Sequence, residues 1–123
     1  MKGLSIGILV LLFLSAGTGY ARAAEEPEAA RIRYLVSAIE TLRGATFIRN
    51  GSEYDSGAAA DHLRLKLRSA GKRVKTAEDF IRLCGTRSSV SGEPYRIRFA
   101  DGTLVETAAF FREALKRFPP QKP

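Results

Sequence analysis

Apolar side chains recur at the spacing of one helix face in four stretches of this chain. Residues 27–43 carry the clearest stripe, in which apolar positions follow an i, i+3, i+4, i+7 pattern: Ile32, Leu35, Val36, Ile39 and Leu42. Such a pattern predicts an amphipathic helix with one buried face. Similar stripes predict helices over 56–70, over 77–84 and from about 107 to 118.

Three short segments have the character of strands. Residues 46–49 combine β-branched and aromatic side chains and are too few for a helix. Residues 95–99 alternate apolar and basic positions, and residues 103–105 follow directly after them. We expect the sheet to contribute four side chains to the core: Phe47, Ile97, Phe99 and Leu104.

Two turn signals connect these segments. Asn50-Gly51 tolerates positive φ, and we expect 52–57 to continue as a loop that caps the next helix through Asp55 or Ser56. Asp101-Gly102 is a signal for a two-residue hairpin turn. A third connection, 86–94, is rich in Ser, Gly and Pro, and we expect its one valine, Val90, to point inward.

The order of elements predicts an α+β fold, a small three-stranded, mostly antiparallel sheet with about four helices packed on one face. Residues 24–123 would form one small domain, with a disordered tail at 119–123. The N-terminal segment lies outside this domain. It has a basic residue, an apolar run of 4–14 and small residues around position 23, the pattern of a signal peptide cleaved after Ala23.

Export through such a leader predicts a periplasmic or secreted protein without a membrane anchor once the leader is removed, because the apolar run is shorter than a membrane span. Lys2 and Arg22 leave with the leader, so the formal charge falls from +7 to +5. This charge favours anionic partners, but the acidic residues are dispersed among the basic ones, which argues against nucleic acid. Cys84 is the single cysteine and falls on a predicted apolar stripe, so we expect a buried free thiol.

The candidate site surrounds the only histidine. His62 and Lys66 lie one helical turn apart on the same flank, and Arg49 and Asn50 end the strand that precedes this helix. Ser89 and Tyr95 would join them if the second strand pairs with the first. We expect no metal site and no cofactor, because the chain has neither a cluster of metal-ligating residues nor a glycine-rich phosphate loop.

Four segments together resemble a family, the YfeK-like family of small exported bacterial proteins, a domain of unknown function. These segments are Phe47-Ile48-Arg49-Asn50-Gly51, His62-Leu63-Arg64-Leu65-Lys66-Leu67, Thr76-Ala77-Glu78-Asp79-Phe80-Ile81 and Ser91-Gly92-Glu93-Pro94-Tyr95. The resemblance covers the mature chain in order. It implies a Gram-negative periplasmic protein and implies no activity.

Three functions remain open from the sequence. A binding module would use Arg49, His62 and Lys66 to hold an anionic envelope ligand or partner. A small hydrolase would use His62 as a base and Ser88, Ser89 or Ser91 as a nucleophile, although no nucleophile motif surrounds these serines. An accessory protein would pair through an exposed sheet edge. The residue pattern favours a non-enzymatic binding module or accessory protein over an enzyme.

Overall fold

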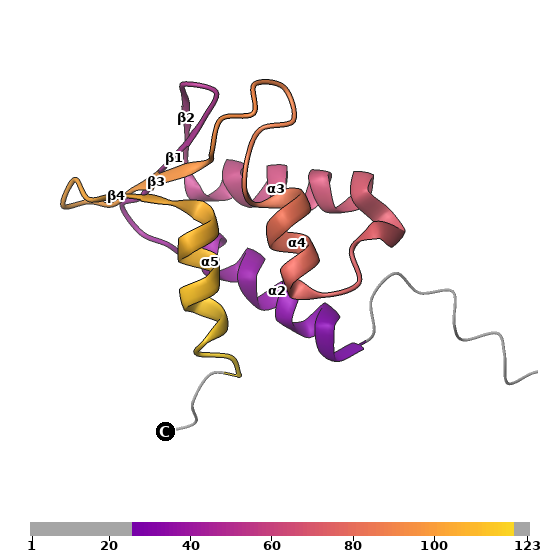
Figure 1. Cartoon of the computed structure of the whole chain (residues 1–123). Coiled ribbons are helices and arrows are strands. Elements are labelled where there is room, and N and C mark those ends of the chain that lie inside the picture. The colour runs from indigo at the N-terminus through magenta and orange to yellow at the C-terminus, as the bar shows by residue number, and fades with distance from the viewer. Residues whose placement is uncertain (1–25, 120–123) are drawn as a thin grey trace, which may run out of the picture.

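The computed structural model describes residues 26–119, in which four α-helices adjoin a small antiparallel sheet (Figure 1). In chain order the elements are α2 (Glu26–Glu40), β1 (Thr46–Arg49), β2 (Ser52–Tyr54), α3 (Ser56–Ala70), the single 3₁₀ turn η3 (Gly71–Arg73), α4 (Ala77–Cys84), β3 (Arg96–Arg98), β4 (Leu104–Glu106) and α5 (Thr107–Leu115). The predicted α+β class is therefore confirmed. The predicted leader and the tail beyond residue 119 lie outside the described residues.

The sheet has four strands rather than the predicted three, in the order β2-β1-β3-β4. The additional strand is β2, which occupies the first half of the segment 52–57 that was expected to be a loop. Asn50 and Gly51 have φ angles of 51° and 75°, and two successive positive φ angles are what a tight type I′ hairpin turn requires. The chain therefore reverses at once, and Tyr54 pairs with Phe47 across the hairpin.

The second hairpin, between β3 and β4, turns at the predicted Asp101-Gly102 pair, but its loop has one residue more than the two that were predicted. The Phe99 amide donates to the Thr103 carbonyl at 2.8 Å, which leaves three residues in the loop, and Gly102 closes it with φ of 89°. A shift of one residue moves every following side chain to the other face of a strand. Val105 consequently lies opposite Ile97 and packs against the core, whereas Leu104 is 53% exposed and was wrongly predicted to be buried.

The core lies between the helices and the sheet face that carries Phe47 and Ile97, both buried. The predicted stripe of α4 is buried as expected, and so is that of α2 except for Leu42, which is partly buried. The rings of Phe80 and Phe111 meet at a centroid distance of 5.6 Å where α4 packs on α5. Cys84 is a buried free thiol, as predicted, and burial raises its pKa. No helix within residues 26–119 combines the length and apolar character needed to cross a membrane.

The 86–94 loop is held by a polar side chain rather than by its valine. Val90 is 87% exposed, so the expectation that it points inward is wrong. Ser88 is buried instead, and its Oγ accepts from the amides of Val90 and Ser91 at 3.0 and 3.3 Å. The Ser88 hydroxyl thus provides a hydrogen-bond acceptor for two backbone amides of the same turn.

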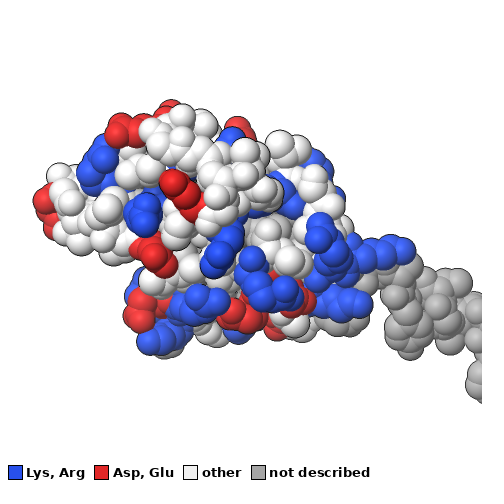
Figure 2. Space-filling view, turned by 45° about the horizontal axis from the view of Figure 1, so that its top comes forward, with Lys and Arg blue, Asp and Glu red and all other residues white. Residues whose placement is uncertain are grey.

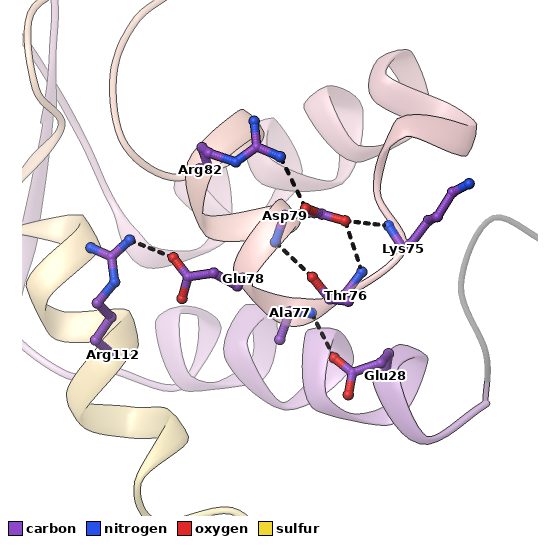
Figure 3. A network of polar contacts seen from close by, with 8 residues as sticks. All are labelled: Glu28, Lys75, Thr76, Ala77, Glu78, Asp79, Arg82 and Arg112. Carbon is purple, nitrogen blue, oxygen red and sulfur yellow. Dashed lines mark hydrogen bonds and ion pairs between the residues drawn. The ribbon is translucent and has the colours of Figure 1, made fainter.

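The N-terminus of α4 is the most densely hydrogen-bonded helix end, and Figure 3 shows its contacts. Thr76 Oγ1 accepts from the Asp79 amide at 3.0 Å, and the Asp79 carboxylate accepts from the Thr76 amide at 3.2 Å, which completes a capping box. Glu28 of α2 reaches the same end and accepts from the Ala77 amide at 2.8 Å. This bond connects α2 to α4, although the two residues lie far apart in the sequence.

We expect Gly85→Ala to destabilise the protein by about 1–3 kcal/mol, the usual cost of overpacking a core. A Cβ at this position would lie 2.5 Å from Cε2 and 2.9 Å from Cδ2 of Phe111, a ring with no exposed surface. Urea denaturation measures the change. Gly57→Ala is the matched control, since its Cβ meets nothing closer than 3.7 Å and alanine favours a helix. Equal stability of the two variants would contradict the close packing of α4 on α5.

We expect Glu28→Ala to lower the free energy of unfolding by about 1–3 kcal/mol, because the Ala77 amide would be buried without an acceptor. Glu28→Gln is the control. Like the alanine variant it loses the ion pair with Arg31, but it keeps an oxygen that can accept from the Ala77 amide. Thermal unfolding of both variants separates the two contributions. If the glutamine variant is as unstable as the alanine variant, the hydrogen bond to α4 is not what stabilises the structure.

Candidate functional site

A pocket of about 140 Å³ lies between the first half of α3 and the β2-β1-β3 part of the sheet. It exists because β1 pairs with both neighbours, so that residues from three strands face the same helix. Half of its wall is apolar: Ile39, Phe47, Ile48, Ala58, Ala59 and Leu63. The other half carries polar or charged groups: Arg49, Tyr54, His62, Tyr95, Arg96 and Thr107.

Tyr95 lies at the centre of the polar half, with 7% of its surface exposed. Lys66 Nζ donates to its hydroxyl at 3.0 Å and to the Arg87 carbonyl at 3.2 Å. His62 Nε2 lies 3.4 Å from the same hydroxyl, and the two rings meet edge to face at an angle of 84°. Two side chains one helical turn apart on α3 thus converge on one phenol, as their spacing on one flank predicted.

The charges around the pocket are positive. The pKa of His62 is lowered, first because the ring is partly buried and then because the positive charges of Arg49 and Lys66 lie close to it. The Arg49 guanidinium lies over the Tyr54 ring, 5.5 Å from its centroid. Neither Arg49 nor Lys66 forms an ion pair with any carboxylate in residues 26–119.

Several other basic side chains within residues 26–119 also lack an ion pair, but Arg49 and Lys66 differ from them because both lie close to the partly buried His62 ring. Blue and red side chains lie next to one another on the left and lower parts of the face in Figure 2, whereas blue ones predominate on its right. Arg33 pairs with Glu26 at 2.8 Å, and Arg64 pairs with both Glu40 and Asp61. The pocket is therefore a place where positive potential remains available to an anion.

The structure brings together most of the predicted site residues. Arg49, His62 and Tyr95 line the pocket, and Lys66 contacts it through the Tyr95 hydroxyl. The remaining two lie beside it. Asn50 occupies the β1-β2 turn and accepts from the Ser91 hydroxyl, and Ser89 is exposed in the 86–94 loop; neither belongs to the pocket wall.

Sequence reasoning missed three polar members of the wall. Tyr54 was placed in a loop, so its pairing with Phe47 was not foreseen. Arg96 was expected on the sheet face opposite Tyr95, and alternation alone gave no reason to include it. Thr107 is buried at the start of α5, where its amide donates to the Tyr95 carbonyl at 2.9 Å. The Asn50-Gly51 pair was the one signal that could have revealed Tyr54.

Two of the three candidate serines, Ser88 and Ser91, have structural partners, and the third, Ser89, is exposed. Ser88 Oγ accepts from two backbone amides, and Ser91 donates to Asn50. Within the described residues no serine hydroxyl bonds to His62, whose neighbour is the Tyr95 hydroxyl. A nucleophile and its base need to be within hydrogen-bond reach, so the geometry offers no observation in favour of the hydrolase alternative.

Comparison with known proteins gives a consistent result. The family described as "Family of unknown function (DUF5329)" matches residues 26–119. The chain is also similar to the "Uncharacterized protein YfeK" of Salmonella typhimurium, with 36% identity over 95 residues that cover 77% of each chain. No solved structure matches it. The resemblance to a YfeK-like domain of unknown function, inferred from four sequence segments, is thereby confirmed, and the export that it implied stays a prediction.

We expect the His62 ring to titrate below its ordinary pKa of 6.5. Arg49→Gln and Lys66→Gln should each raise this pKa, since each removes a nearby positive charge, whereas Lys72→Gln on the exposed η3 turn should not. Proton NMR measures it directly because the chain has one histidine.

The same shift has a consequence for stability. The unfolded chain binds the proton more readily than the native chain, so stability is complete above pH 6.5 and falls as the pH drops through that value toward the native pKa. A native pKa at or above 6.5, or one that neither variant changes, would contradict the proposed convergence of charges.

Proposed function

The chain belongs to the DUF5329 family, whose function is unknown, and we propose from its site that it is a non-enzymatic binding module that holds an anionic ligand or partner of the bacterial envelope. The observation that carries this proposal is a group of positive side chains at one pocket: Arg49 and His62 line it, and Lys66 donates to its Tyr95 hydroxyl. Among the carboxylates of residues 26–119, none pairs with Arg49 or Lys66. Uncompensated cations weaken a folded protein through mutual repulsion. An anion in the pocket would relieve that repulsion.

The geometry of Arg49 supports the same conclusion. Its guanidinium lies over the Tyr54 ring, and stacking of this kind holds the planar group without using its N–H donors. Those donors are then available to an incoming anion, which a guanidinium binds through two parallel hydrogen bonds. Lys66 differs, because its ammonium already donates to Tyr95 and Arg87, and its contribution is mainly charge.

The periplasmic location is part of the proposal and rests on the leader pattern of residues 1–23. An exported binding module meets carboxylates and phosphates of the cell envelope, and the net charge of +5 after cleavage favours both. Nucleic acid is not among the proposed partners, since acidic and basic side chains pair over much of the surface.

We expect at least one anion in a panel of phosphate, small carboxylates and peptidoglycan fragments to raise the melting temperature, since a ligand that binds only the native state stabilises it. Arg49→Ala should weaken that binding roughly ten- to hundredfold, because a hydrogen bond to a charged group contributes about 1.5–3 kcal/mol. Isothermal titration measures the change in affinity. Arg68→Ala, on the exposed side of α3, is the matched control and should bind as the unaltered protein does.

Two outcomes would contradict the binding function. One is a flat thermal response to the entire panel while Arg49→Ala itself is destabilised, which would make the cluster a structural feature. The other is an anion whose affinity falls equally in Arg49→Ala and Arg68→Ala, since this would indicate attraction to the general charge rather than to the pocket.

A further inference from the structure

The pocket has more apolar surface than an inorganic anion could use. Its floor consists of core side chains, among them Ile39, Phe47 and Leu63, which are 0%, 6% and 5% exposed. Arg49 and His62 are partly exposed and therefore stand nearer its mouth. A ligand that fills this space presents a charged end to the cations and an apolar body to the floor.

The volume of the pocket limits the size of the ligand's apolar part. About 140 Å³ is close to the roughly 150 Å³ of an apolar cavity that accommodates benzene. One six-membered ring or a chain of five to six carbons would occupy it. A long acyl chain would not fit inside the pocket.

The hydrogen-bond donors at the mouth of the pocket indicate which charged group the ligand carries. The Arg49 guanidinium lies over the Tyr54 ring and has no hydrogen-bond acceptor within residues 26–119, whereas the Lys66 ammonium and the Tyr95 hydroxyl are already bonded to one another. One guanidinium fork matches the two oxygens of a singly charged carboxylate.

We infer that the ligand of this pocket is a small amphiphilic monocarboxylate, with its carboxylate on Arg49 and a ring or chain of about six carbons on the floor formed by Ile39, Phe47 and Leu63. This inference rests on the proposed binding function and narrows it to one class of compound. It also assigns a role to the apolar half of the pocket, which anion binding alone leaves without one.

The test compares three probes on the purified full chain: hexanoate, acetate and hexanol. Each buried CH₂ contributes roughly 0.8 kcal/mol, or about fourfold in affinity, so hexanoate should bind more than tenfold tighter than acetate. Hexanol, which lacks the charge, should bind at least tenfold more weakly than hexanoate. The His62 ring signals report occupancy by NMR, and isothermal titration gives the affinities.

A pocket-filling variant provides the second measurement. Ala58 lines the pocket yet is exposed, so Ala58→Leu can narrow the pocket without disturbing the core. Hexanoate affinity should fall at least tenfold in this variant. Ala109→Leu makes the same change at an exposed position of α5 away from the pocket, and its affinity should stay as it was. Thermal unfolding confirms that both variants are folded.

The outcomes separate this inference from the proposed function. Equal affinities for acetate and hexanoate, or an Ala58→Leu variant that binds hexanoate normally, would overturn the amphiphilic ligand and leave the anion site intact. Equal affinities for hexanol and hexanoate, with Arg49→Gln having no effect, would overturn the anion site as well. Absence of binding by either acid overturns the inference, and the anion panel then decides the proposed function.

Discussion

The antiparallel pairing of β1 with β3 is the constraint on which the site depends. It sets Phe47 opposite Ile97, and both side chains are buried against the helices. The same register places Tyr95 beside α3, where His62 and Lys66 reach its hydroxyl. Without this pairing the polar residues around position 62 and those around position 95 would belong to separate surfaces.

Contacts among the helices stabilise the position of the segment that leads to Tyr95. α4 is joined to α2 through Glu28 and to α5 through the ion pair of Glu78 with Arg112 at 2.6 Å (Figure 3). Its C-terminal end meets the ring of Phe111 at Gly85, where a larger residue would not fit. The loop that leads from α4 to Tyr95 therefore begins at a well-anchored point, and a pocket formed by anchored elements needs little ordering when a ligand binds.

The pocket combines two features that oppose stability. It leaves apolar surface next to solvent, and it gathers positive charge around a histidine whose pKa is lowered first by partial burial and then by that charge. Elsewhere the protein pairs many of its arginines with carboxylates, as Arg98 does with Glu53 at 2.8 Å. Because both features occur at the same place, and because one kind of molecule would satisfy both, a ligand explains them together better than two separate structural roles do.

The sequence by itself determined where the four helices lie and which face of each turns inward, because these depend on neighbours within one or two turns. It also indicated Thr76 as the cap of α4 and offered Asp55 and Ser56 for α3, of which Asp55 is the cap. It also indicated Arg49, His62, Lys66 and Tyr95 as a group. Only the tertiary structure decided the fourth strand, the exposure of Leu104 and Val90, and the apolar floor of the pocket. Strand register changes with one residue of loop length, and a cavity arises from side chains of several elements that no local pattern relates.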